Sequence, residues 1–346
     1  MDLNTLWFIL LGVLLAGYAI LDGFDLGVGI LHLAVRKDEE RRVLMNAIGP
    51  VWDGNEVWLL AFGGAMFAAF PHAYATVFSG FYTAFMLLLV ALIARAVSIE
   101  FRGKRDTPGW RGLWDRVFFG GSAAATLLFG VATGNVLCGL PIGADKEFQG
   151  GLLDLLRPFP LLVGVLALAT FTMHGALYLL LKTDGDLQQR VRGWFRRAYG
   201  VFVALYLLTT VAALFAVPLA PKTLSGLALR NFHTQPALWA MVALNVLAIV
   251  AIPIAVRRGR LGWAFLSSCV TIAAFTGLFG AAMFPELAHS SLNPSWSLDI
   301  YNAASSAKTL RIMTVIAGIG MPLVLLYTAV IYRVFRGKVR LDATSY

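Results

Sequence analysis

The sequence predicts an all-α polytopic membrane protein with about nine transmembrane helices in one integral membrane domain, residues 1–346. Hydrophobic residues make up 59% of the chain, charged residues make up 14%, and the mean hydropathy is +0.75. Soluble domains carry about one-quarter charged residues, so a soluble fold would leave large apolar cores with little polar cover. Apolar runs of about 20 residues, the length that an α-helix needs to cross a bilayer, recur along the chain.

Nine apolar segments are the candidate spans. Their bounds are Leu6–Leu31, Val57–Phe70, Ala73–Ala94, Val117–Leu137, Phe159–Leu181, Ala198–Leu219, Pro236–Val256, Leu261–Phe284 and Thr309–Tyr332. The second segment is short for a span unless its helix begins near Val51. Such a start would bring the acidic residues that follow Val51 to the membrane edge.

The distribution of basic residues sets the predicted orientation. With nine spans, the loops and the tail on one side hold 22 of the 28 Lys and Arg residues, and the other side holds six. Basic loops remain in the cytoplasm. We therefore expect the N-terminus outside and the C-terminus in the cytoplasm, which requires an odd number of spans. The net charge of +9 is thus assigned to membrane topology, and no nucleic-acid partner is expected.

Two acidic residues, Asp22 and Asp25, lie inside the first segment. Charged side chains within a span are costly and usually functional. Their spacing of three residues places both on one helix face. Gly23 and Gly27 would let another helix approach closely and shield the carboxylates from lipid. The alternative is that both acids mark the wet end of the helix and only meet the basic loop.

A second polar group, containing Trp52, Asp53 and Glu56, precedes the second segment. Asp53 has two interpretations, a functional acid or a cap for the free N–H groups and the positive dipole end of the helix. Trp52 and Trp58 are also typical of the interfacial aromatic belt. The density of Trp, Asp, Asn and Glu in this stretch is nevertheless higher than a helix N-terminus alone requires.

Glu100 and Lys104 follow the third segment. Their spacing of four residues is the favourable one for a surface ion pair, which is the simplest interpretation of the pair taken alone. Under the predicted orientation, however, they share the cytoplasmic side with Asp22, Asp25 and Asp53. A chain of carboxylates can accept and pass protons. The sequence therefore predicts a proton path from the cytoplasm along these residues.

The remaining candidates give little chemistry of the soluble kind. The chain holds no Walker, GxGxxG or HExxH pattern, and the spacing of its two cysteines predicts no metal site. His174 is the one histidine well inside an apolar segment. It could ligate haem or hydrogen-bond a neighbouring helix, and the second is favoured because no second ligand is evident.

Four motifs carry a resemblance to a known family. They are DGFDLGVG (22–29), GPVWDGNEVW (49–58), GGAMFAAFP (63–71) and FRGK (101–104), and weaker matches follow along the rest of the chain. On these motifs the sequence resembles subunit II of the cytochrome bd-type quinol oxidases. These are terminal oxidases of aerobic respiration in the cytoplasmic membrane of bacteria or archaea.

The resemblance implies an architecture and partners. Subunit II in this family has two four-helix bundles plus one helix, here about residues 6–137, 159–284 and 309–332. It forms a heterodimer with subunit I, which carries two b-type haems and one d-type haem and oxidises quinol. A small single-span subunit and a structural quinone occur in some members. The resemblance thus implies an electrogenic quinol:O₂ oxidoreductase in which this chain, haem-free and embedded in the bilayer, is not catalytic alone.

The resemblance also implies residue roles. By motif position, Asp25, Asp53, Glu100 and Lys104 fall where the proton path of the family lies, with Glu100 at a place where other members can have Asp. Asp22, Glu56 and Trp52 are additional candidates near that path. His174 stands where Gln can occur in relatives, which argues against an essential haem ligand.

Two other functions fit part of the sequence. One is a proton-coupled secondary transporter, a class that tends to show inverted repeats and broken helices at the bilayer midplane. The acids here lie toward one face, which disfavours it. The other is a passive scaffold whose acids only cap helices and form ion pairs.

Overall fold

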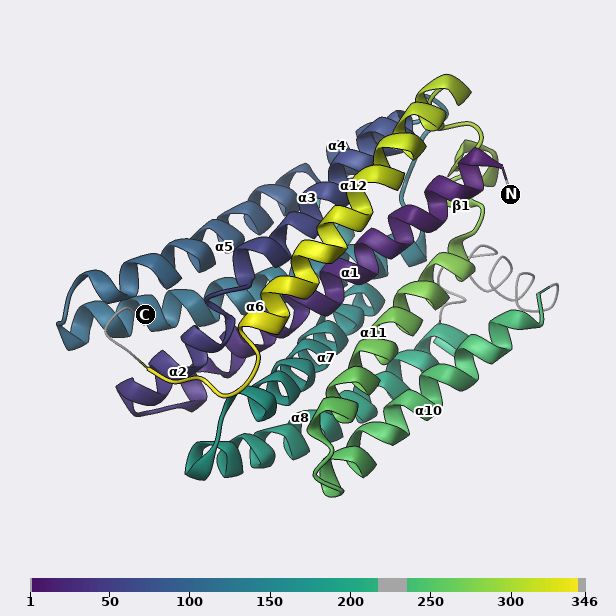
Figure 1. Ribbon diagram of the computed structural model, residues 1–346. Helices are drawn as coiled ribbons and strands as arrows, with labels where there is room; N and C mark the ends of the chain where they lie inside the picture. Colours follow the sequence, from purple (N-terminus) through teal and green to yellow (C-terminus); the bar gives the residue numbers. More distant parts are fainter. Residues whose placement is uncertain (1, 217–234, 342–346) are drawn as a thin grey trace.

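Figure 1 shows the computed structural model, which describes residues 2–216 and 235–341. Long helices run side by side, and a small two-stranded sheet lies near one end. Within these residues, eight helices are long and apolar enough to cross a membrane. The prediction of an all-α polytopic protein is therefore confirmed, while the count of nine spans, the two bundles and the orientation of the termini stay predictions.

The first half contains α1 (Leu3–Leu31), α2 (Asp38–Ile48), α3 (Trp52–Ala69), α4 (Pro71–Gly80), α5 (Tyr82–Phe101) and α6 (Pro108–Cys138). The second half contains α7 (Pro158–Lys182), α8 (Gly185–Val211), α10 (Ala237–Arg257), α11 (Leu261–Met283) and α12 (Ala307–Val334). Short 3-10 turns lie at His32–Ala34, Arg102–Lys104, Leu152–Leu155 and Pro294–Trp296, and a π-helical turn, Ala212–Ala216, follows α8. The strands β1 (Glu286–Ala288) and β2 (Leu298–Asp299) pair antiparallel.

Helix α1 is the centre of the arrangement. It packs against α3, α6, α7 and α11, and α12 lies over α1 and α3 (Figure 1). Its first turn is capped by Asp2, whose carboxylate accepts a hydrogen bond from the Thr5 amide at 2.7 Å, and this bond lowers the pKa of Asp2. At its other end, a Cβ added to Gly27 would lie 1.9 Å from the carbonyl oxygen of Phe171 on α7. The sequence predicts the close approach of another helix at this glycine, and the structure shows that this helix is α7.

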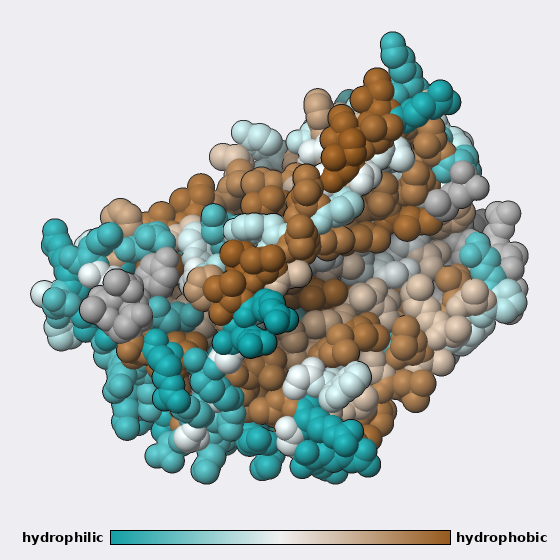
Figure 2. Space-filling view, in the orientation of Figure 1, coloured by the Kyte–Doolittle hydropathy of each residue, from teal (hydrophilic) through white to brown (hydrophobic). Residues whose placement is uncertain are grey.

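The surface has the pattern expected of a chain that faces lipid. Figure 2 shows apolar side chains across the middle of this face, with hydrophilic side chains gathered toward its two ends. On α12, large apolar side chains such as Ile316, Ile319 and Leu326 are more than 60% exposed. Exposed apolar area of this extent is unfavourable in water and neutral in lipid.

Two segments differ from their predicted form. The predicted span Ala73–Ala94 is wrong as one helix, because α4 ends at Gly80 and α5 begins at Tyr82. Gly80, the last residue of α4, lies against Phe148 of a distant loop, where an added Cβ would be 2.6 Å from the ring. Helix α2 was not predicted, since it is too short and polar to be a span.

The second predicted span begins at Trp52 in α3, close to Val51 as its length required. At 18 residues, with two acids near its start, α3 is not among the eight apolar spanning helices. The predicted end of the sixth span, at Leu219, lies outside the described residues. The other predicted bounds agree with the helices within a few residues, except that α6 and α8 begin about ten residues earlier.

Candidate functional site

A buried ion-pair cluster joins α1, α3 and α5. Arg95 donates from Nη2 to Asp22 Oδ1 at 2.7 Å and from Nη1 to Glu56 Oε1 at 2.5 Å. The side chains of Asp22 and Arg95 are fully buried, whereas 25% of the Glu56 side chain is exposed. Arg95 thus neutralises one carboxylate in the low-dielectric interior and reaches a second one nearer the surface.

Asp25 lies one turn further along α1 and belongs to a second set of contacts. Its Oδ2 accepts a hydrogen bond from Asn55 Nδ2 at 2.7 Å, and Asn55 Oδ1 accepts one from the Tyr332 hydroxyl of α12 at 3.0 Å. Asp25 is fully buried, and its carboxylate forms no salt bridge within the described residues. The hydrogen bonds of Asn55 therefore connect α1, α3 and α12 around a carboxyl group held away from solvent.

The cluster has polar atoms without a protein partner. Asp22 Oδ2, Asp25 Oδ1, Arg95 Nε and the Tyr18 hydroxyl are buried and form no hydrogen bond with any described residue. Buried polar groups in proteins are usually satisfied by protein atoms or by ordered water. This part of α1 therefore has sites that can bind water, and water is the common carrier of protons between carboxylates.

The depth of these groups follows from helix geometry. At 1.5 Å per residue, Asp22 lies about 28 Å along α1 from Leu3, and Arg95 lies about 20 Å along α5 from Tyr82. Both positions are at least four residues from the end of their helix. Because Asp22 and Asp25 are fully buried, the alternative that they mark the wet end of the helix does not fit this chain.

The other predicted residues of the path lie at the surface of this chain. Asp53, Glu100 and Lys104 are exposed, and Trp52 is half-buried. The capping interpretation of Asp53 is wrong in detail, because the N-cap of α3 is Val51 and Asp53 lies in the first turn. There its charge still faces the positive end of the helix dipole. The structure thus places Asp22, Asp25 and Glu56 together, whereas Asp53, Glu100 and Lys104 are exposed side chains.

The surrounding packing fixes where α3 lies. Trp58 is buried against α1, and a Cβ added to Gly17 would be 2.2 Å from the Trp58 ring. Trp58 is therefore a packing residue and not a belt residue exposed at the interface. Its contact holds α3 against α1 one turn after the Asn55–Asp25 hydrogen bond.

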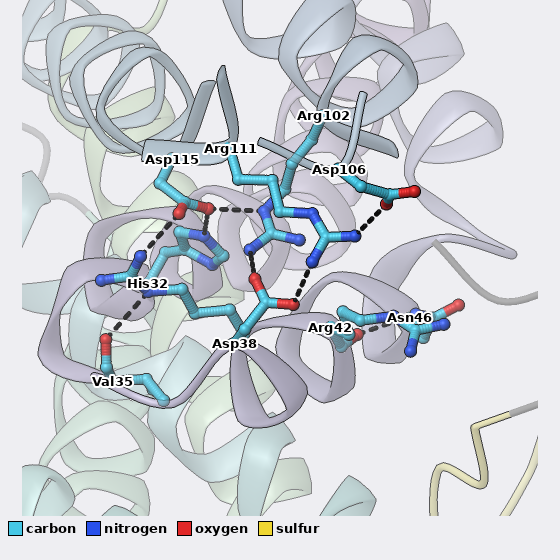
Figure 3. Close-up of polar contacts among 10 residues, drawn as sticks. His32, Val35, Asp38, Arg42, Asn46, Arg102, Asp106, Arg111 and Asp115 are labelled. Carbon is cyan, nitrogen blue, oxygen red and sulfur yellow. Dashed lines mark hydrogen bonds and ion pairs between the residues drawn. The ribbon is translucent and has the colours of Figure 1, made fainter. Parts of the chain in front are cut away.

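A second polar network lies around Arg102, where α5 ends and the turn Arg102–Lys104 begins (Figure 3). Asp115 of α6 is its centre and is 1% exposed. Its Oδ1 accepts from His32 Nε2 and from Arg102 Nε, both at 2.6 Å, and its Oδ2 accepts from Arg41 Nη1 at 2.6 Å. Asp115 therefore ties the ends of α1, α2 and α5 to α6 through one carboxylate.

The network continues outward to the solvent. Arg102 Nη2 donates to Asp38 Oδ1 at 2.5 Å, and Asp38 Oδ2 accepts from Arg111 at 2.9 Å. Arg111 also pairs with Asp106, which is 90% exposed (Figure 3). Arg102 is only 3% exposed and stands between Glu100 and Lys104. The network thus holds the backbone from which these two exposed side chains project.

Comparisons with known proteins cover almost the whole chain. A family model described as cytochrome bd terminal oxidase subunit II matches residues 3–335. The chain belongs to this family. It is 38% identical to the cytochrome bd-I ubiquinol oxidase subunit 2 of Escherichia coli (strain K12), over 97% of this chain and 95% of that protein. It is 36% identical to the cytochrome bd ubiquinol oxidase subunit 2 of Bacillus subtilis (strain 168), over 98% and 97%.

The fold is also similar to a solved structure. A chain of the bd oxidase from Geobacillus thermodenitrificans matches with a TM-score of 0.81 at 18% identity, covering 97% of this chain and 99% of that one. The resemblance predicted from the motifs is therefore confirmed, and this chain is a subunit of a bd-type terminal oxidase. These relatives are bacterial, so the mention of archaea in the predicted localisation has no support.

In this family member, His174 is a packing residue. Its Nδ1 lies 2.6 Å from Ser268 Oγ and its Nε2 lies 2.9 Å from the Ile20 carbonyl oxygen, while its ring stacks on Phe265. An axial haem ligand needs a free ring nitrogen. His174 as placed does not offer one, so its geometry does not fit haem ligation.

Sequence reasoning missed three residues of the site. Arg95 was counted among the basic loop residues, although it follows 13 mostly apolar residues of α5. Its position inside an otherwise apolar helix was the available signal, because an arginine there needs an acidic partner. Asn55 and Tyr332 had no comparable signal, since their roles depend on how α12 packs on α3.

Proposed function

We propose that this chain is the haem-free subunit II of a bd-type quinol oxidase and that it contributes a proton path from the cytoplasm for the reduction of O₂ to water. The reaction O₂ + 4 H⁺ + 4 e⁻ → 2 H₂O consumes protons, and charge separation requires that they come from the inner side. The single observation that carries the proposal is the cluster of Asp22, Asp25, Glu56 and Arg95 between α1, α3 and α5, in which all but Glu56 are fully buried. Buried ionisable groups at this depth are rarely retained without a function.

The cluster supports a path in steps. Asp53 and Glu56 are three residues apart on one face of α3, so an exposed acid and a partly exposed acid are neighbours. Glu56 shares Arg95 with Asp22, and Asp22 is three residues from Asp25 on α1. In this proposal protons enter near Asp53, pass Glu56, and reach Asp25 through water bound to the unpartnered carboxylate oxygens. The Arg95 guanidinium would stabilise the carboxylate that remains negatively charged when a proton leaves.

Glu100 and Lys104 lie at the cytoplasmic end of the same route in this proposal. Glu100 is five residues beyond Arg95, about 8 Å along α5. Glu100 lies in the last turn of α5 and Lys104 in the turn Arg102–Lys104, on the two sides of the buried Arg102 along the chain. They would collect protons at the surface, where exposed acids exchange protons with water rapidly. Subunit I would cover part of this region in the complex.

The remaining parts of the proposal concern partners. The names of the relatives indicate a ubiquinol oxidase, and we propose the same reaction class here, with two b-type haems, one d-type haem and quinol oxidation in subunit I. Two four-helix bundles, residues 6–137 and 159–284, plus the helix at 309–332 would form the scaffold. A structural quinone in this chain, a small single-span subunit and the bilayer complete the proposed surroundings. No observation favours the transporter or the passive scaffold over this reading.

The test replaces Asp25 in the complete complex. Asp25→Asn keeps the size of the side chain and a hydrogen bond to Asn55, but it cannot carry a proton. We expect turnover per haem to fall by at least about tenfold while haem content and complex yield stay at the parental level. Asp186→Asn, an exposed acid in the first turn of α8, is the matched control and should not change turnover. Unchanged turnover in Asp25→Asn would contradict the proposed path, and Asp25→Glu should restore part of the activity.

A further inference from the structure

The arginines at the cytoplasmic ends of the helices fall into two kinds. Three of those near α2 and the end of α5 are neutralised, since Arg41, Arg102 and Arg111 pair with Asp115, Asp38 or Asp106. Arg190 pairs with Glu40 in the same way. These four arginines therefore have acidic partners within the chain.

The turn between α10 and α11 is different. Arg257, Arg258 and Arg260 are all exposed there, and none of them forms an ion pair within residues 2–216 and 235–341. The start of α8 adds to them, because Arg192 reaches the carbonyl oxygen of Val256 at 3.4 Å. Arg196 is one turn further along the same face of α8. We call these five residues the α8–α10 arginine patch.

The patch borders a hollow at the start of α11. The hollow has a volume of about 360 Å³ and is lined by Arg260, Gly262, Trp263 and Leu266. Trp263 is 64% exposed and Leu266 is 49% exposed, so both side chains face outward from the helix. A Trp beside an apolar residue at a helix end is typical of the level where headgroups meet acyl chains. The hollow thus combines a guanidinium, an aromatic ring and an apolar wall.

We propose that the α8–α10 arginine patch and this hollow bind the headgroup of an anionic phospholipid. The guanidinium groups would bind the phosphate through charge-assisted hydrogen bonds, and the acyl chains would lie along Trp263 and Leu266. Positive loops alone explain the orientation of the protein, but they do not explain why three arginines without an ion pair border a hollow lined by an exposed Trp and an exposed Leu. A soluble phosphate ligand would leave the exposed Trp263 and Leu266 without a partner. A phospholipid would contact both the arginines, through its phosphate, and the apolar side chains, through its acyl chains.

The expected effect follows from the charge of the patch. Each Lys or Arg near an anionic membrane surface strengthens binding by about fivefold. Loss of the three arginines of the turn should therefore weaken binding by about 100-fold. Loss of Arg260 alone, which lines the hollow, should weaken it by at least about fivefold.

The experiment uses the purified complete oxidase complex and native mass spectrometry. Phosphatidylglycerol is titrated against phosphatidylcholine, and the lipid molecules bound per complex are counted. The test variant is R257Q/R258Q/R260Q, and the matched control R36Q/R105Q/R116Q removes the same charge from exposed positions near α2 and the start of α6. We expect the test variant to lose the tightly bound phosphatidylglycerol, with phosphatidylcholine binding unchanged, and the control to keep it.

Three outcomes would overturn the proposal. They are equal retention of phosphatidylglycerol by test and control variants, equal loss from both, and full displacement of the lipid by inorganic phosphate. The last would identify an anion site without lipid selectivity. If the triple variant does not assemble, Arg260→Gln alone decides, because parental retention in that variant contradicts the role of the hollow. The readout is lipid binding and not turnover, so it does not depend on the proposed proton path.

Discussion

Replacement of Arg95 by Gln tests whether the buried cluster is held together by its one cation. Arg95 is the only basic side chain that contacts Asp22 or Glu56 within the described residues. Arg95→Gln removes both ion pairs and leaves the fully buried Asp22 carboxylate without a charged partner. Gln can replace at most one of the two hydrogen bonds. We therefore expect destabilisation rather than a selective loss of turnover.

The magnitude follows from burial. Removing one partner of a buried pair costs about 3–5 kcal/mol. The pair with Glu56 adds at most about 1 kcal/mol, because a quarter of that side chain is exposed and water screens it. For a chain of this size, the sum lowers the melting temperature by roughly 5–10 °C. Stabilities of single domains are only about 5–15 kcal/mol, so the yield of assembled complex should also fall.

The assay is thermal unfolding of the purified complex, followed by loss of the haem absorbance and by size-exclusion chromatography. The double variant Asp22→Asn/Arg95→Gln replaces the charged pair with a neutral one. It should recover at least half of the loss, which corresponds to a coupling of about 2–3 kcal/mol. Arg190→Gln, which breaks an exposed pair with Glu40, is the control and should shift the melting temperature by no more than about 1 °C. A melting temperature of Arg95→Gln equal to that of this control would refute the reasoning.

Three further predictions concern other positions. Asp115→Asn leaves three donor side chains without their charged acceptor, so we expect a loss of about 3–5 kcal/mol in stability. Asp106→Asn, at a position that is 90% exposed, is the control and should change the stability by less than about 1 kcal/mol. Denaturation of the complex measures both changes. Gly27→Ala places a Cβ 1.9 Å from a carbonyl oxygen of α7 and should prevent assembly of the complex. Gly12→Ala on the same helix, with no atom within 4 Å of the new Cβ, should not prevent it. The measurement is the amount of haem-containing complex per amount of membrane protein, and equal amounts for the two variants would contradict the close helix contact. His174→Gln should leave the haem spectrum of the complex unchanged, and the loss of a haem band would show that the hydrogen-bonded geometry is not the functional one.

Most of the fold could be predicted from the sequence because the bilayer imposes a length on each apolar run. Helices such as α7, α10 and α11 begin or end within one or two residues of the predicted bounds. The break between α4 and α5 was not predicted, and it lies beside Gly80, which packs against the distant Phe148. Helix α2 was missed for a related reason, because an amphipathic helix of 11 residues has no membrane signature.

The candidate site was only half predictable. A carboxylate inside an apolar run is visible in any sequence, and so Asp22 and Asp25 were found. Their partners lie 30 to 73 residues away on other helices, and which side chains face them depends on helix rotation. Arg95 was therefore assigned to a loop, and Asn55 was noted only as part of a polar stretch. The hydrogen bonds of a membrane interior are set by packing that sequence periodicity does not determine.

Asp53, Glu100 and Lys104 illustrate the opposite case. The motifs give their positions, and the structure places them at the surface of this chain. Their assignment to the proton path stays a prediction. The variants of Asp25 and Arg95 test the buried part of the same proposed path.

The most direct test of the central claim is the rate of proton uptake from the cytoplasmic side after a single pulse of O₂. The complex, reconstituted in vesicles and fully reduced, is followed with a pH-sensitive dye on that side, with the haem absorbance recorded in parallel. The account predicts that Asp25→Asn slows proton uptake by at least about tenfold, while O₂ binding to the haem keeps its parental rate. Proton uptake at the parental rate in an intact Asp25→Asn complex would contradict it.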